Sequence, residues 1–338
     1  MNSDDSEVFA GVDLGGTKIA AVVAGKDGRI LAEGVIPTQA EEGPEQAVRR
    51  TCRLLNDLGQ EHKEMHRATG VGLPGLIDGA AGKIIFLPNL PVSWRGFPIS
   101  AAFAEERQGP VFLLNDARMA ALGEFTYGLG RGGEDLLFVT VGTGIGGGLV
   151  LNGKLLLGAF GAAGEIGHHT ILPDGPPCSC GANGCLETLV SGPTLARAGS
   201  ALMKQGLAPR LNELTHGDSA RITATLMARA AQDGDQSVAV VIESAARYLG
   251  VGIANAVSIT AVRHVVIGGG LSSLGEMLLE PVRREVLRRV RMFPAESVTI
   301  QVSALGEKCG ALGGVALAAQ QFRSNANTEF ARTNQALA

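Results

Sequence analysis

Two similar stretches, about 125 residues apart, limit the folds that this chain can adopt. Each contains three short apolar runs separated by turn residues: "VFAGVDL", "KIAAVVAG" and "RILAEGVI" in the first, and "DLLFVTVGTG", "GGGLVLNG" and "KLLLGAF" in the second. Such runs are typical of antiparallel strands joined by tight turns. Candidate helices and single strands follow each set. The pattern predicts an α/β protein with mixed sheets that arose by internal duplication.

The same order of elements is expected after each set of strands. In the first half we predict helices at 44–58, 99–107 and 117–125, and strands at 69–73 and 110–116. In the second half we predict helices at 192–204, 220–232, 236–259 and 275–290, strands at 264–270 and 297–305, and a last helix from 310 to about 322. The 338 residues, 45% hydrophobic and 18% charged, suffice for a large core and two domains.

Charge and hydropathy exclude two classes of partner. The net charge is −4, and the most basic stretch, "RREVLRRVR" at 283–291, is typical of a solvated helix face, so we expect no binding to nucleic acid. The longest apolar runs, "LLFVTV" and "HVVIGGGL", are far shorter than the roughly 20 residues that cross a bilayer, so we expect no membrane role. The acidic, polar start lacks the features of a secretory signal, which predicts a cytoplasmic location.

A glycine-rich turn follows the first strand of each set: "DLGGTK" at 13–18 and "VGTGIGGG" at 141–148. Glycine lets backbone N–H groups crowd around an anion, because it has no Cβ and tolerates positive φ. Two such turns would suit the phosphates of a nucleotide, although an ordinary tight hairpin remains open for each. Gly142, Gly144 and Gly147 also fit the dinucleotide-binding fingerprint, but the residues that follow read as a hairpin, whereas the fingerprint requires a helix.

Residues 165–187, "EIGHHTILPDGPPCSCGANGCLE", form a second candidate site, which we name the clip. Cys178, Cys180, Cys185 and His168 make up the Cys₃His set that a tetrahedral zinc ion favours. Four protein ligands leave no place for water, so the zinc would be structural and would order a loop with little core of its own. A redox-active or merely adjacent group of thiols is the alternative. His169 competes with His168 as the ligand.

These motifs, together with "LPG", "LPNL", "LLNDARMAALGE", "GEIGHH" and "VVIGGGL", stand in the order and spacing of the ROK family of sugar kinases. The chain resembles the family's bacterial glucokinases most and its N-acylmannosamine kinases next, over about residues 8–320. The resemblance implies a two-lobed actin-like ATPase (ribonuclease H-like) fold, with ATP and sugar in the cleft between the lobes, and homodimers or homotetramers. It implies a small lobe at 1–118 plus a C-terminal helix at about 310–323, a large lobe at 119–309, and a polar tail at 324–338.

The resemblance also assigns residues to the sugar. Asp116 matches the catalytic base that takes the proton of the attacking hydroxyl; taken alone, an aspartate between a strand and a helix is more often an N-cap. The matching sugar-binding residues are Gly75, Asn89, Asn115, Asp116, Glu165, His168 and Glu187. His168 would bind zinc through one ring nitrogen and a sugar hydroxyl through the other.

A further set matches the nucleotide-binding positions of the family. Its members are Asp13, Gly15, Gly16, Thr17, Lys18, Thr143, Gly144, Gly268, Gly269 and Gly270. Asp13 would hold Mg²⁺ through water, since Mg²⁺ keeps several waters and takes few carboxylates. Lys18 would help to neutralise phosphate, or be solvated.

The resemblance therefore predicts an ATP-dependent hexose kinase that makes glucose 6-phosphate. One alternative is an N-acylmannosamine or N-acetylglucosamine kinase, with "PVSWRGF" at 91–97 as a segment where specificity would differ. A sugar-responsive transcription regulator of the same family is disfavoured, because twelve residues before Asp13 are too few for a helix-turn-helix. A polyphosphate donor in place of ATP stays open.

Overall fold

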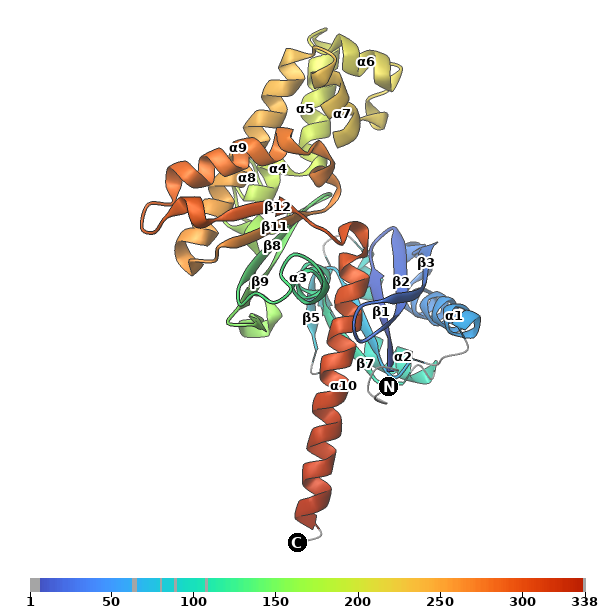
Figure 1. Cartoon of the computed structure of the whole chain (residues 1–338). Coiled ribbons are helices and arrows are strands. Elements are labelled where there is room, and N and C mark those ends of the chain that lie inside the picture. The colour runs from blue at the N-terminus through green and yellow to red at the C-terminus, as the bar shows by residue number, and fades with distance from the viewer. Residues whose placement is uncertain (1–6, 63–65, 80, 88–89, 107–108, 337–338) are drawn as a thin grey trace. The chain divides into compact units, whose positions relative to one another are not determined.

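The computed structural model (Figure 1) describes residues 7–62, 66–79, 81–87, 90–106 and 109–336, with only the backbone for 61, 62 and 325–336. The chain forms two compact units. The first consists of Met1–Glu134, Gly148–Ala163 and Glu307–Ala338, and the second of Asp135–Gly147 and Gly164–Gly306.

The first unit is built on a five-stranded sheet of order β3-β2-β1-β4-β7. The strands are β1 (Val8–Leu14), β2 (Lys18–Gly25), β3 (Ile30–Pro37), β4 (Thr69–Leu73) and β7 (Val111–Asn115). β1, β2 and β3 pair antiparallel, as the three apolar runs predict, and β4 and β7 extend the sheet parallel to β1. A separate hairpin is formed by β5 (Leu76–Asp78) and β6 (Lys83–Phe86).

The α-helices described in this unit are α1 (Pro44–His62), α2 (Ile99–Glu105), α3 (Asp116–Tyr127) and α10 (Cys309–Ala336). α10 packs closely on β1, β4 and α3 through glycines. A Cβ on Gly11 would lie 1.8 Å from the carbonyl oxygen of Ala311, and one on Gly70 2.1 Å from that of Gly314. The helix backbone thus approaches the strands more closely than any side chain allows, which ties the C-terminal segment to the N-terminal strands.

A second five-stranded sheet repeats the strand order of the first, as β10-β9-β8-β11-β12. Its strands are β8 (Leu136–Val141), β9 (Ile145–Leu151), β10 (Lys154–Leu155), β11 (His264–Gly268) and β12 (Thr299–Val302). The repeated order agrees with the predicted duplication. β9 begins at Ile145, directly after the glycine turn, which confirms that no dinucleotide-binding helix starts there.

The helices of the second unit are α4 (Leu186–Val190), α5 (Gly192–Lys204), α6 (Pro209–Thr215), α7 (Ala224–Gln232), α8 (Gln236–Thr260) and α9 (Glu276–Arg289). Among the described residues, α8 is the one helix long and apolar enough to cross a membrane, and half of its most apolar 18-residue window is buried. A core helix passes the same test. α8 contains no unbroken apolar run of that length, because Glu243 and Arg247 stand among its apolar residues.

Several elements differ from the sequence predictions. α10 continues through the predicted polar tail to Ala336 rather than ending near Phe322, since no glycine or proline follows Gly314 to stop it. α4, α6 and the β5–β6 hairpin were not predicted, and the third strand of the second set has only two residues. The first unit also contains residues 119–134 and 148–163, which the sequence prediction assigned to the large lobe.

Candidate active site

Three strands of the first unit end at one edge of the sheet. In the parallel register, Asp13 of β1 pairs with Gly72 of β4, and Leu73 pairs with Asn115 of β7. The carboxyl ends of parallel strands are where open α/β sheets place their ligands. Asp13, predicted from "DLGGTK", and Asn115 and Asp116, predicted from "LLNDARMAALGE", therefore lie at the same edge.

Both atoms of the Asn115 side-chain amide form hydrogen bonds at the start of α3. Its Oδ1 accepts hydrogen bonds from the backbone N–H groups of Ala117 (3.0 Å) and Arg118 (3.3 Å), while its Nδ2 donates to the carbonyl of Gly75 (2.9 Å). Asn115 is thus the N-cap of α3, a function that sequence reasoning had weighed for Asp116. Oδ1 of Asp116, the first residue of the helix, also accepts from Ala117 N, at 2.8 Å.

Asp13 has an unusual electrostatic environment. Burial and the nearby carboxylate of Asp116 raise its pKa to about 7, against a smaller opposing effect of Lys18. Two carboxylates close together in one partly buried site favour a bound cation, because each one disfavours ionisation of the other. This edge of the sheet is suited to hold a hard divalent ion such as Mg²⁺.

The raised pKa predicts a pH-dependent stability. Between pH 3.8 and about 7 the folded chain binds more protons at Asp13 than the unfolded chain does, so Asp13 lowers the stability of the free protein progressively over this range. Asp13→Asn should therefore be more stable than the wild type by about 2 kcal/mol at pH 5, and by about 4 kcal/mol at pH 8, without Mg²⁺ and nucleotide. Each kcal/mol of added stability should raise the Tm of the variant by roughly 2–4 °C. Thermal melts of both proteins across this range test it, and a Tm difference that stays constant with pH would contradict it.

The first glycine turn lies next to Asp13. The N–H of Gly15 donates to the carbonyl of Lys18 (3.0 Å), and Gly16 and Thr17 are exposed. Lys18 is neither free nor simply solvated, since its Nζ lies 2.5 Å from Oε2 of Glu307. Both side chains of this ion pair are well exposed, so it stabilises the fold little and could yield to a phosphate.

In the second unit, the other glycine turn is held by the last residue of the clip and by the segment that follows it. Oε2 of Glu187 accepts from Ile145 N (2.8 Å), and Gly192 N donates to the carbonyl of Gly142 (2.8 Å). A Cβ on Gly144 would lie 2.3 Å from Glu187 Oε2, so a side chain there would displace the Glu187 carboxylate from the turn. The contact between Glu187 and this turn was not predicted from the sequence. The glycine at 144, which leaves room for the carboxylate, is the local feature that agrees with it.

The turn after β11 adjoins the same region. Gly269 has a φ of +81°, and a Cβ there would lie 2.5 Å from the carbonyl oxygen of Val141. Gly270 N lies 3.8 Å from the position of a Cβ on Gly142. The predicted nucleotide residues of this unit, Thr143, Gly144 and Gly268–Gly270, thus belong to neighbouring turns.

The clip brings its four predicted ligands together. The donor atoms of His168, Cys178, Cys180 and Cys185 all lie within 4.8 Å of one another. His168 Nδ1 is 3.6 Å from Cys178 Sγ, and the Sγ atoms of Cys180 and Cys185 are 3.7 Å apart. A tetrahedral zinc ion with ordinary bond lengths separates nitrogen from sulfur by about 3.6 Å and two sulfurs by about 3.8 Å, whereas a disulfide requires about 2.05 Å. The donor set and spacing fit zinc.

Local structure explains how the clip folds without a core. Gly184 has a φ of +62°, and a Cβ there would lie 1.5 Å from the carbonyl oxygen of Leu172. Burial and the neighbouring thiols of Cys178 and Cys180 raise the pKa of Cys185 to about 12, so a cation is needed to hold three thiolates. His169 lies apart from the cluster, with its Nδ1 at the carbonyl of Ile166.

The structure thus groups the predicted site residues by unit. Asp13, Gly15, Gly16, Thr17, Lys18, Gly75, Asn115 and Asp116 belong to the first, and Thr143, Gly144, Glu165, His168, Glu187, Gly268, Gly269, Gly270 and the three clip cysteines belong to the second. Asn89 lies outside the described residues. Glu165 immediately precedes the 3₁₀ turn Ile166–His168, and His168 N donates to its carbonyl (3.0 Å).

Two sheets of the same strand order, each with a glycine turn after its first strand, define a protein of the actin-like ATPase fold. The sequence profile of the ROK family matches residues 9–321, and the chain belongs to this family. A glucokinase of Halalkalibacterium halodurans is 36% identical over 320 residues, which cover 94% of this chain and 96% of that protein.

Two other similar proteins bear on the substrate. A crystal structure of a ROK family glucokinase from Streptomyces griseus in complex with glucose and AMPPNP superposes with a TM-score of 0.80 at 34% identity, covering 93% of this chain and 99% of that one. An N-acetylmannosamine kinase of Escherichia coli is 35% identical over 260 residues, 77% of this chain and 82% of that protein.

Proposed function

We propose that this protein is an ATP-dependent hexose kinase that phosphorylates glucose at its 6-hydroxyl. The observation that carries the proposal is the edge of the first sheet, where Asp116 lies beside Asp13 and the first glycine turn, in a chain 34% identical to a glucokinase that binds glucose and a nucleotide. Carboxylates and phosphate-gripping turns are the groups that phosphoryl transfer needs.

In the proposed reaction Asp116 is the general base. Its carboxylate takes the proton of the sugar hydroxyl, the hydroxyl oxygen attacks the γ-phosphorus of ATP, and ADP leaves with the electrons of the broken bond. Mg²⁺ would neutralise the phosphate charge, held through water by Asp13. The backbone N–H groups of the two glycine turns, with Lys18, would hold the phosphates.

Sugar recognition is assigned to Gly75, Asn89, Asn115, Glu165, His168 and Glu187. Amides and carboxylates in a desolvated site reject a sugar whose hydroxyl points the wrong way, since a buried polar group is then left unpaired. Two of these side chains already use one oxygen atom for a bond within the protein, which leaves fewer atoms to bind the sugar. The Oδ1 of Asn115 caps α3, and the Oε2 of Glu187 binds Ile145 N, so Glu187 would receive the sugar through Oε1.

We assign a structural zinc ion to His168, Cys178, Cys180 and Cys185. Zinc would supply no reaction step; it would hold the clip closed. Because His168 Nδ1 faces the cysteines, the other ring nitrogen would donate to a sugar hydroxyl, with its tautomer fixed by the metal. A cytoplasmic homodimer or homotetramer acting in glycolysis completes the proposal.

A coupled assay that follows ADP tests the function. Glucose should give the highest kcat/KM among glucose, mannose, fructose, allose, N-acetylglucosamine and N-acetylmannosamine, with ATP preferred to polyphosphate. The similarity to the N-acetylmannosamine kinase makes that sugar the second candidate. Turnover with none of these sugars would defeat the proposal.

A further inference from the structure

The segment between β3 and α1 grips the first glycine turn. We name residues Thr38–Gly43 the strap. Thr38 is fully buried; its Oγ1 donates to the carbonyl of Gly15 (2.7 Å), and its N–H donates to the carbonyl of Thr17 (2.9 Å). One strap residue thus holds both sides of the turn.

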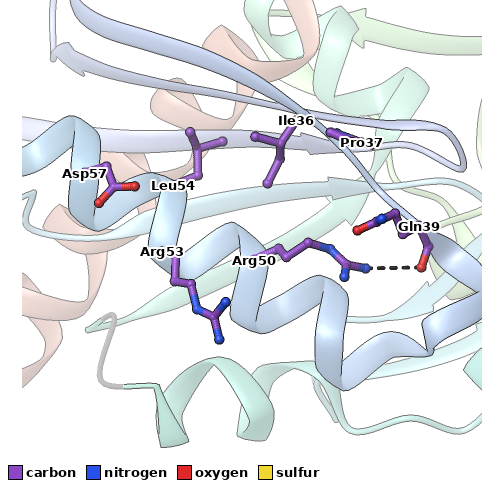
Figure 2. A pocket seen from close by; sticks show the side chains of 7 residues that line it. All are labelled: Ile36, Pro37, Gln39, Arg50, Arg53, Leu54 and Asp57. Carbon is purple, nitrogen blue, oxygen red and sulfur yellow. Dashed lines mark hydrogen bonds between the residues drawn. The ribbon is translucent and has the colours of Figure 1, made fainter.

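Arg50, on α1, holds the strap in turn. Its Nη2 donates to the carbonyls of Thr38 (2.5 Å) and Gln39 (3.1 Å), and its Nη1 lies 2.5 Å from Oε2 of Glu42. Figure 2 shows the side chain reaching from the helix to Gln39. The Arg50 side chain is only 17% exposed, and its charge-assisted bond to Thr38 is partly buried, whereas its bonds to Gln39 and Glu42 are exposed.

The strap would not keep this shape unaided. Gln39 has a φ of +50°, a left-handed conformation that is unfavourable for a residue with a Cβ. The two N–H groups of Arg50 Nη2 bind the two successive carbonyls, while Nη1 of the same guanidinium bonds Glu42, so one side chain fixes three points of the strap. Two other bonds hold the strap: Glu42 N donates to the carbonyl of Gln39 (3.0 Å), and Trp94 Nε1 donates to the carbonyl of Ala40 (3.0 Å). Neither of them reaches Thr38.

We propose that Arg50 is a positioning residue for nucleotide binding, acting through Thr38 on the glycine turn Gly15–Lys18. The expected change in the KM for ATP rests on the proposed kinase function. The expected change in the nucleotide Kd does not. Without the guanidinium, Gln39 can relax to negative φ, and Thr38 then moves away from Gly15 and Thr17. The turn would still form, but its N–H groups would no longer be preorganised for phosphate.

The surroundings of Arg50 offer a matched control. A pocket of about 310 Å³ is lined by Ile36, Pro37, Gln39, Arg50, Arg53, Leu54 and Asp57 (Figure 2). Arg53 is exposed and makes no hydrogen bond or ion pair with any residue that the structure describes. It lies one helical turn from Arg50 and lines the same pocket, so Arg53→Met removes an equal charge without touching the strap.

Calorimetric titration with AMPPNP and Mg²⁺ tests the inference on the whole protein. Arg50→Met should raise the nucleotide Kd about tenfold and the KM for ATP similarly, with the KM for glucose within twofold of the wild type. Arg53→Met should leave all three within twofold. Thr38→Val should reproduce the effect of Arg50→Met, and Thr38→Ser, which keeps the hydroxyl, should restore wild-type binding.

Nucleotide Kd values for Arg50→Met and Thr38→Val within twofold of Arg53→Met would overturn the inference. If Arg50→Met does not fold, the comparison of Thr38→Val with Thr38→Ser decides. If the wild-type protein binds AMPPNP but phosphorylates no sugar, the proposed function is wrong. The nucleotide Kd values of the variants would still test the inference about Arg50.

Discussion

Asp116→Asn should lower kcat by about 10²–10⁴-fold, the usual contribution of a positioned general base. Asparagine has nearly the same shape and its Oδ1 can still accept from Ala117 N, so the start of α3 should be preserved. It cannot take a proton from a sugar hydroxyl. The KM values for glucose and ATP should change less than threefold, because the lost step belongs to the transition state rather than to binding.

Steady-state kinetics together with a thermal melt check this result. Asp57→Asn, at an exposed position of the same unit, is the matched control and should retain wild-type kcat. A variant at Asp116 that is folded and turns over within threefold of the wild type would remove Asp116 from the mechanism. A rise in KM with kcat unchanged would make Asp116 a sugar-binding residue only.

Loss of the clip metal should have the second large effect. Cys180→Ser removes one thiolate at an exposed position, so little packing is lost with it. We expect metal analysis to find one zinc per wild-type chain and well under half of that in the variant. Because structural zinc stabilises small sites by on the order of 10 kcal/mol, the variant should melt roughly 10 °C lower or more.

The kinetic consequence of metal loss follows from the residues tied to the clip. Glu165 and His168 belong to it, and Glu187, two residues after Cys185, holds Ile145 N in the second glycine turn. The KM for glucose should therefore rise at least tenfold, and the KM for ATP by a smaller factor. Ser179→Ala, between the two cysteines, should keep its zinc and its kinetics. Full zinc content and unchanged KM in Cys180→Ser would show that the clip does not need this ligand.

The elements that could be predicted are those whose cause is local. Strands were found because short apolar runs and the turn residues that bound them lie within a few positions of each other, and β4 was predicted at its observed bounds. The cysteine spacing predicted the cluster with His168 for a similar reason, since a four-residue turn brings Cys185 back to Cys180. By contrast, the last helix was predicted to end near Phe322, ahead of a polar tail, whereas α10 continues to Ala336 in a segment that has no glycine or proline.

The sequence by itself determined the turns, the glycine positions and the compact metal site. Each of these features is formed by residues that are neighbours in the chain. Only the tertiary structure decided which groups each side chain binds. Asn115 rather than Asp116 caps α3, Glu187 reaches back 42 residues to Ile145, and Arg50 acts on the first glycine turn through Thr38. Such contacts depend on how sheets and helices pack, and many residues of equal chemistry compete for them along the chain.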